Sequence, residues 1–197
     1  MAIREEDVRA RAGRPRDPAC DAAILQAALD IFAVEGYAGV SIDGVAARAG
    51  VGKATIYRRY SSKAELVVEA VRCGASVDDW LPDTGHLRAD LISMMEPLVE
   101  RLRGDDAKLL MMFAVERQRD PDLQEQFNRS VIGKKREHLC HLVASAIERG
   151  ELPADADVDL IAEAAPALIW HHALYGLPLD DDLLDRILDL VLPAPEQ

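Results

Sequence analysis

The chain has 197 residues, enough for one large or two small domains with a buried core. Hydrophobic residues make up 49% of it and aromatic residues only 5%, and alternating β-branched runs are few, so an all-α protein with an aliphatic core is expected. The net charge of −12 excludes a protein that is basic throughout, and no apolar run is long enough to cross a bilayer.

The charge is unevenly distributed along the chain. Residues 1–63 carry a net charge of +2 and residues 64–197 carry −14, so a nucleic-acid-binding surface is expected only in the first third. Cys20, Cys73 and Cys140 are far apart and form no Cys-x-x-Cys motif, and no secretory signal is present. These features are typical of unpaired thiols in a cytoplasmic protein; a redox sensor is the less favoured alternative.

Residues 1–16 form a polar arm that ends in Gly13-Arg14-Pro15-Arg16. Pro15 disfavours a helix there and keeps the backbone extended. Such a flexible basic arm can lay Arg14 and Arg16 along DNA phosphates or into a minor groove. A solvated tail without a DNA contact is the alternative.

The first long helix is expected to begin at Asp17 as N-cap, with Pro18 at its first position, and to stop at Gly36. Its buried stripe should consist of Ile24, Leu25, Ala28, Ile31 and Phe32.

Ser41 to Lys63 read as two short helices joined by a turn, followed by the start of a third helix. Ser41 is a suitable N-cap, and Gly50 can end the first helix with left-handed dihedral angles. Gly52 is a weak N-cap for the second helix, which we expect to run from Lys53 to Tyr60.

Two faces are expected on this second helix. Ile56 and Tyr60 are four residues apart and should share the buried face. The opposite face then presents a basic, hydrogen-bonding surface without a carboxylate, formed by Ala54 and Arg58 with Thr55 and Tyr57 beside them and Lys53 and Arg59 at the edges. This surface suits a DNA major groove. An ordinary helix hairpin with a chance cluster of positive charge is the alternative.

The segment GVGKATIYRRYSSKAEL, with the helix before it, resembles the DNA-binding domain of TetR-type transcriptional repressors over about residues 17–70. The resemblance implies a three-helix helix-turn-helix domain over residues 17–63 and a larger helical domain for ligand binding and dimerisation. It also implies a palindromic double-stranded DNA operator that is released by a small apolar or amphipathic effector. The expected DNA-binding residues are Arg14, Arg16, Ser41, Arg48, Lys53, Ala54, Thr55, Tyr57, Arg58 and Lys63.

Within this set, the resemblance implies base contacts from Ala54, Thr55 and Arg58, and phosphate contacts from Ser41, Thr55, Tyr57 and Lys63. The family often has Ser or Thr at the position of Gly52, so one capping side chain and one possible phosphate contact are missing here. Glycine is tolerated at an N-cap, so this departure weakens a contact and not the resemblance.

A connecting helix is expected over residues 64–79. Ser62 can cap it, with Glu65 as capping-box partner, and its apolar positions continue to about Val77. The resemblance assigns this helix to the coupling between ligand and DNA.

Residues 80–197 should form the C-terminal domain, after a loop from Trp80 to Gly85. Apolar periodicity and caps predict helices over Leu87–Arg103 with a kink at Pro97, from an Asp105 cap to about Arg117, from Asp120-Pro121 to about Arg149, over Val158–Tyr175, and over Asp180–Val191. The Val158–Tyr175 run is apolar nearly all the way round, so we expect it to be buried on several sides. The last two helices can make a homodimer interface, which we favour, or close the monomer core.

The resemblance also implies a ligand cavity in this domain. Methionines and aromatic side chains suit an adaptable apolar site, although core packing explains each of them singly. The adjacent Met94 and Met111 belong to the same methionine set, and helical histidine pairs add pocket-lining candidates in preference to a metal site. The expected ligand-binding residues are Met95, Met112, Phe113, Phe127, His138, His141 and Trp170.

No nucleophile motif, Walker loop or dinucleotide fingerprint is present, so we expect neither an enzyme nor a cofactor or metal. The sequence interpretation is therefore a homodimeric, ligand-responsive DNA-binding repressor. An α-helical enzyme and a protein-interaction module are the alternatives.

Overall fold

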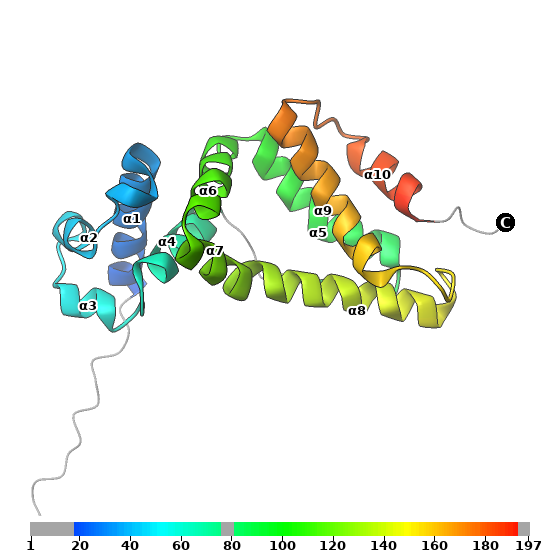
Figure 1. Cartoon of the computed structure of the whole chain (residues 1–197), viewed down its shortest axis with the longest axis horizontal. Coiled ribbons are helices and arrows are strands. Elements are labelled where there is room, and N and C mark those ends of the chain that lie inside the picture. Colours follow the sequence, from blue (N-terminus) through cyan, green and yellow to red (C-terminus); the bar gives the residue numbers. More distant parts are fainter. Residues whose placement is uncertain (1–17, 76–80, 193–197) are drawn as a thin grey trace, which may run out of the picture.

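A computed structural model describes residues 18–75 and 81–192 (Figure 1). The predicted basic arm, with Arg14 and Arg16, and the Asp17 cap lie outside these residues. The described residues form helices and no strand, which confirms the all-α fold: α1 (Pro18–Gly39), α2 (Ile42–Ala49), α3 (Lys53–Tyr57), α4 (Lys63–Gly74), α5 (Leu87–Arg103), α6 (Ala107–Arg119), α7 (Pro121–Phe127), the π-helical turn η1 (Asn128–Ile132), α8 (Gly133–Arg149), α9 (Val158–Tyr175) and α10 (Leu183–Val191).

The helices are arranged in two groups (Figure 1). Helices α1, α2 and α3 lie at one end, and α4 leads from them toward the rest of the chain and packs against both α1 and α7. Helices α5, α8, α9 and α10 form the other end, where α8 packs along α9. Helices α6 and α7 lie between the groups: α6 packs against α1 and α4 on one side and α5 on the other, and α7 packs against α4.

Side-chain caps begin several helices where the sequence predicts them. The Ser41 Oγ accepts a hydrogen bond from the Gly44 N–H at 3.1 Å, and the Ser62 Oγ accepts one from the Glu65 N–H at 3.0 Å. The Glu65 carboxylate accepts from the Ser61 N–H at 2.6 Å, one residue earlier than a standard capping box. These bonds satisfy orphan donors and so fix the starts of α2 and α4.

Glycines with positive φ angles stand at the ends of two predicted helices. Gly36 has φ 70° and ψ −174°, so the regular part of α1 ends there as expected, although one more helical segment follows it to Gly39. Gly50 ends α2 with φ 67° and ψ 32°, the left-handed conformation that its position requires.

Some boundaries differ from the sequence prediction. Helix α3 ends at Tyr57 and not at Tyr60, because residues 58–59 form a turn that leads into α4. Asp106, and not Asp105, stands at the start of α6 and makes no side-chain cap, and α10 begins at Leu183 and not at Asp180. Helix α5 continues through Pro97.

The predicted long helix from residue 121 to 149 is divided by the π-helical turn η1. The Ser130 Oγ of this turn donates a hydrogen bond to the Gln126 carbonyl of α7 at 2.7 Å. A π-helical turn holds an extra residue relative to α-helix, and such turns are frequent at functional sites. Periodicity alone does not reveal it, because the apolar positions continue on both sides.

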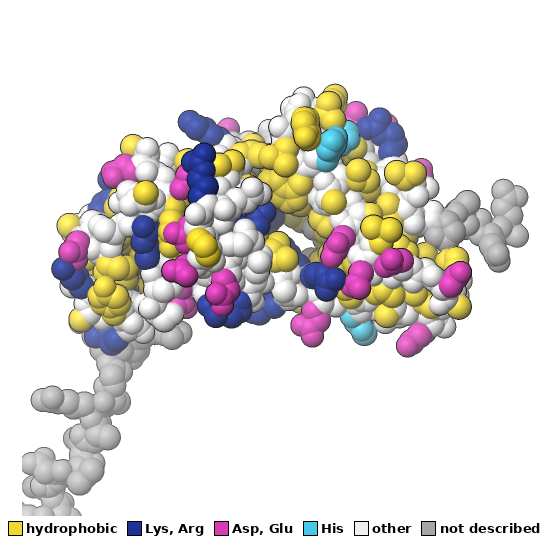
Figure 2. All heavy atoms as spheres, in the orientation of Figure 1, with side chains coloured by type: hydrophobic (Ala, Val, Ile, Leu, Met, Phe, Trp, Pro, Cys, Tyr) yellow, Lys and Arg dark blue, Asp and Glu magenta, His cyan; other side chains and the backbone are white. Residues whose placement is uncertain are grey.

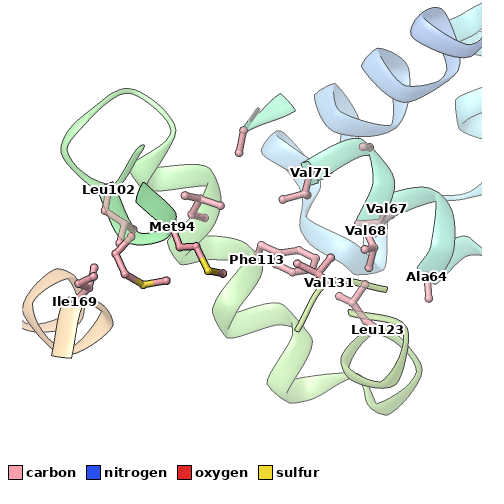
Figure 3. Close-up of a cluster of buried hydrophobic side chains, with 14 of the residues drawn as sticks. Ala64, Val67, Val68, Val71, Met94, Leu102, Phe113, Leu123, Val131 and Ile169 are labelled. Atoms are coloured by element: carbon pink, nitrogen blue, oxygen red, sulfur yellow. The ribbon is translucent and has the colours of Figure 1, made fainter. Parts of the chain in front are cut away.

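Aromatic side chains connect the cores of the two groups. The Phe32 ring of α1 meets the Phe113 ring of α6 edge-on with 6.1 Å between centroids, and Phe113 meets Phe127 of α7 at 5.1 Å. Figure 3 shows Phe113 between Val68 and Val71 of α4 on one side and Met94 of α5 on the other. Phe113 therefore packs against helices from both ends of the molecule.

Helix α9 is less buried than its apolar sequence predicts. Only Ala162, Ala165 and Ile169 are buried in it, whereas Leu174 is 59% exposed and Tyr175 is 73% exposed. The expectation of burial on several sides is wrong for the single chain, because α8, α5 and α10 cover only part of the helix. None of the described helices is long and apolar enough to span a membrane.

Replacing Phe113 by alanine should lower the free energy of unfolding by about 3–5 kcal/mol, because a buried ring is lost from the junction of both groups. Urea unfolding followed by circular dichroism measures this loss. Val115→Ala, at a 47% exposed position on the same helix, is the matched control and should change the value by less than about 0.5 kcal/mol. Equal stabilities for the two variants would contradict the role given to Phe113.

Candidate nucleic-acid interface and internal cavity

Helix α3 presents the outward face that the sequence predicts. Ile56 is fully buried and Tyr60 is 9% exposed, whereas Tyr57 is 60% exposed. Lys53, Ala54 and Arg58 are exposed on the same surface, and Thr55 is half-buried at its edge. The buried pair thus fixes α3, which packs against α2, and turns the phenol and the guanidinium toward solvent.

The cations near α3 differ in their partners. Lys53 pairs with Asp43, and Arg48 pairs with Asp30 at 2.9 Å. Among the described residues Arg58 makes no ion pair, so its guanidinium is available to a base edge or a phosphate. To bind a phosphate, Lys53 and Arg48 must each give up an exposed carboxylate partner. Exposed ion pairs of this kind contribute little to stability, so the exchange costs little.

Arg59 has a structural role, so the prediction that it lies at the edge of the DNA-binding surface is wrong. Its side chain is 12% exposed; its Nε donates to Asp21 of α1, and its Nη1 donates to the Thr55 carbonyl at 3.2 Å. These bonds fix the end of α3 on the start of α1.

Lys63 is half-buried, with its Nζ 4.1 Å from the centroid of the Tyr37 ring. This geometry is a cation–π contact, and burial lowers the pKa of Lys63. The Ser41 hydroxyl lies exposed at the start of α2, where it also serves as cap.

A direct contact joins α6 to the helix-turn-helix. The Glu116 carboxylate accepts a hydrogen bond from the Tyr37 N–H at 3.3 Å, immediately after the Gly36 kink. The Arg117 side chain, one residue further along α6, lines the internal cavity described next. Neighbouring residues of one helix therefore contact the helix-turn-helix and the cavity.

A cavity of about 520 Å³ lies among α4, α5, α6, the end of α7, η1, α8 and α9, within the size range of small-molecule sites. Figure 2 shows a hollow at the centre of the molecule, between the part formed by α6 and α7 and the part formed by α8 and α9, with hydrophobic and basic side chains along its edge. Four predicted ligand-binding residues line the cavity: Met95, Phe113, Phe127 and Trp170.

The sequence matches two family models. The model described as bacterial regulatory proteins of the tetR family matches residues 24–70, and that of the tetracyclin repressor-like C-terminal domain matches residues 81–191. A DNA-binding transcriptional repressor TetR of Mycobacteroides abscessus is 36% identical over 172 residues, which are 87% of this chain and 90% of that protein. The chain belongs to the TetR family of transcriptional regulators.

Solved structures share the fold of this TetR-family chain. The TetR family transcription regulator SCO0332 has a TM-score of 0.65 at 24% identity and covers 87% of this chain and 96% of its own. The regulator FadR of Bacillus subtilis, solved in complex with stearoyl-CoA, has a TM-score of 0.66 at 19% identity and covers 89% and 99%. These likenesses concern the fold alone.

Three predicted ligand-binding residues of this TetR-family protein do not line the cavity. His138 contacts the Pro82 carbonyl through its Nε2 at 2.6 Å, and exposed His141 lies 3.8 Å from the Asp83 carboxylate. Their three-residue spacing does place both on one side of α8, but that side meets residues 82–83. Met112 packs partly buried against the core. In the described part of the chain, no three His, Cys, Asp or Glu side chains gather as a metal site.

Sequence reasoning missed the basic residues of the cavity. The cavity wall includes one carboxylate, Glu163, and five cationic side chains: Arg72, Arg101, Arg117, Lys135 and Arg136. One signal was present in the sequence, since Arg117 follows Phe113 by four residues and so shares its helix face. Met94 of α5 also lines the cavity.

Tyr37 and Tyr60 are buried beneath the helix-turn-helix, and their burial should make the folded protein less stable at alkaline pH. Desolvation, with help from nearby carboxylates, raises the pKa of each to about 12, against about 10 for an unfolded tyrosine. From about pH 10 to about pH 12 the folded chain holds more protons, so the free energy of unfolding should fall as pH rises.

Urea unfolding from about pH 9 to about pH 12 measures this fall. Tyr60→Phe removes one of the two phenols and should make the fall shallower than in the wild type. Tyr57→Phe alters an exposed phenol on the same helix-turn-helix and is the matched control. Equal slopes in all three proteins would contradict the assignment.

Proposed function

We propose that this TetR-family chain is a homodimeric repressor that binds a palindromic DNA operator through α3 and releases it when a small molecule fills the cavity. The outward Tyr57 and Arg58, held there by buried Ile56 and Tyr60, carry the DNA part of the proposal. The proposed units are the arm over 1–16, the DNA-binding domain over 17–63, the connecting helix over 64–79 and the C-terminal domain over 80–197. The protein would act in the cytoplasm and catalyse no reaction.

Each predicted DNA-binding residue has a proposed contact. Arg58 and Thr55 meet base edges, and exposed Ala54 lets α3 approach the groove floor closely. Phosphates are contacted by Ser41, Arg48, Lys53, Tyr57 and Lys63, and by Arg14 and Arg16 from the arm. Lys63 would leave the Tyr37 ring in order to reach a phosphate.

The homodimer is proposed through α9 and α10. Apolar side chains lie exposed along these helices and the segment between them: Leu160, Leu174, Tyr175, Leu177 and Leu190. A second copy would bury them in an isologous interface with two-fold symmetry. That symmetry matches a palindromic operator, because each subunit then places α3 in one half-site.

The effector is proposed to act through α6. This helix lines the cavity with Phe113 and Arg117 and contacts the helix-turn-helix through Glu116 and through Phe113 with Phe32. A bound molecule can release DNA only if it binds one arrangement of the two DNA-binding helix groups more tightly than the other. The stearoyl-CoA of the FadR complex shows that a regulator of this fold can bind an amphipathic molecule.

Alanine at Arg58 should weaken operator binding by about 10- to 100-fold, because one bidentate base contact contributes about 1–3 kcal/mol. The operator is first selected from random DNA, and affinity is then measured by fluorescence anisotropy at several salt concentrations. Exposed Arg129→Ala, outside the helix pair, is the matched control and should bind as the wild type does.

The wild-type affinity should fall steeply with salt because phosphate contacts release counterions. The circular dichroism spectrum of the Arg58 variant must match that of the wild type, so that weaker operator binding is not caused by unfolding. Failure of random DNA to yield a symmetric site, or unchanged binding by the Arg58 variant, would remove the proposal and favour the enzyme or the protein-interaction module.

An aspartate in place of Leu174 should convert the dimer to a monomer, because it puts a charge into the proposed apolar interface. Sedimentation velocity measures the change. Val34→Asp, at an 84% exposed position on α1, is the matched control and should remain dimeric. A monomeric wild type would remove the homodimer proposal, and a dimer that tolerates the Leu174 change would place the interface elsewhere.

A further inference from the structure

The cavity wall combines a large apolar surface with an excess of positive charge. Methionine, leucine, valine and aromatic side chains make up most of it, among them Met94, Met95, Leu110, Val131, Leu139 and Trp170. The carboxylate of Glu163 is already engaged, since Arg136 donates to it at 3.0 Å and to Asp159 at 2.7 Å. The wall thus offers cationic groups to a ligand and no unpaired carboxylate within the described lining.

Arg117 differs from Arg136 and Arg72 of the wall in having no acidic partner among the described residues. Arg136 pairs with Asp159 and Glu163, and Arg72 pairs with Glu69 at 2.9 Å. The half-buried Arg117 guanidinium contacts only neutral groups in the described chain: its Nη1 donates to the Gln124 side-chain oxygen at 3.3 Å, and its Cζ lies 5.0 Å from the Phe127 ring centroid. The Phe127 ring in turn meets the Phe113 ring edge-on, which places the guanidinium beside the apolar wall.

A partly buried charge without a counter-charge is costly, and such groups are frequent at functional sites. Desolvation lowers the pKa of Arg117, which agrees with its placement but leaves the guanidinium charged. An anion that binds in the cavity would supply the missing charge, and a carboxylate fits the guanidinium with two parallel hydrogen bonds.

We propose that the cavity binds an amphipathic molecule with an apolar chain and an anionic head group, and that Arg117 binds the head group. The chain lies against Met94, Met95 and Trp170, and the head group lies at the end formed by Arg117 and Phe127. This inference deepens the effector proposal and rests on it only for the release of DNA; the binding itself is tested separately.

Binding is measured through Trp170, which lines the cavity. The other tryptophan is Trp80, so the Trp80→Phe protein emits from Trp170 alone. Sodium dodecanoate, its methyl ester and dodecyltrimethylammonium are titrated below their micelle-forming concentrations. Dodecanoate should bind at least about 10-fold more tightly than the ester, because a hydrogen bond to a charged group contributes about 1.5–3 kcal/mol, and the cation should bind most weakly.

Arg117→Gln should weaken dodecanoate binding by about 10- to 100-fold and leave the ester unchanged. Arg119→Gln, at an exposed arginine on the same helix, is the matched control and should bind as the wild type does. If Arg117→Gln fails to fold, Arg117→Lys retains the charge and should retain the preference for dodecanoate over ester. The inference is overturned if neither dodecanoate nor dodecanoyl-CoA binds more tightly than the ester, or if Arg117→Gln weakens the binding of neither anion.

Dodecanoyl-CoA separates two sources of the anionic group. If it binds more tightly than dodecanoate and loses that binding in Arg117→Gln, the head group is a phosphate and not a carboxylate, and the inference stands. Operator release is then measured with the same ligands. A ligand that binds through Arg117 without releasing DNA removes the effector proposal alone, whereas failure of operator binding removes the repressor proposal alone.

Discussion

The edge-on contact between Phe32 of α1 and Phe113 of α6 is the point on which the arrangement of the molecule depends. It joins the core beneath the helix-turn-helix to the wall of the cavity, since Phe113 belongs to both. A close-packed aromatic junction has few alternative packings, so a shift on one side must be accommodated on the other. The hydrogen bond from Tyr37 to Glu116 adds a polar connection one helical turn away. The two ends of the chain are therefore in physical contact through α6 as well as through the covalent path along α4.

The same arrangement explains how an acidic chain can offer a DNA-binding surface. The negative charge lies mostly in residues 64–197, whereas α3 carries Lys53 and Arg58 on an exposed face. Burial of Ile56 and Tyr60 fixes which face is exposed, and the bonds of Arg59 to Asp21 fix how α3 sits on α1. The local placement of a few side chains, and not the overall charge, determines what the surface can bind.

Much of the fold could be predicted from the sequence because its determinants are local. The side chains of Ser41, Ser62 and Asp120 cap helices by accepting from backbone N–H groups three residues later. Apolar runs and the residues that bound them predicted the ends of α5 and α9 as the structure has them. The buried face of α3 followed from one four-residue spacing.

The failures come from contacts between residues distant in the sequence. Arg59 pairs with Asp21, which lies 38 positions earlier in the sequence. Helical spacing alone therefore predicted the wrong direction for the Arg59 side chain. His138, His141 and Met112 lie on the expected helices, but packing between helices decides which face meets the cavity. The cationic lining was missed for the same reason, since five separate helical positions converge only in the folded chain.

The π-helical turn at Asn128–Ile132 determines where this part of the chain can gain or lose a residue. Asn128, Val131 and Ile132 of the turn line the cavity, and so do Lys135 and Leu139 of the helix that follows. Five residues of a π-helical turn rotate the chain by about as much as four residues of α-helix, so a deletion of one residue that closes the turn as α-helix would leave Lys135 and Leu139 facing the cavity. A deletion in the regular first turn of α8 has no extra residue to absorb it and would rotate both side chains away from the cavity by about 100°. The turn is thus a place where the chain can change length without re-aiming the cavity wall, and homologues that lack the extra residue should keep the same lining after it.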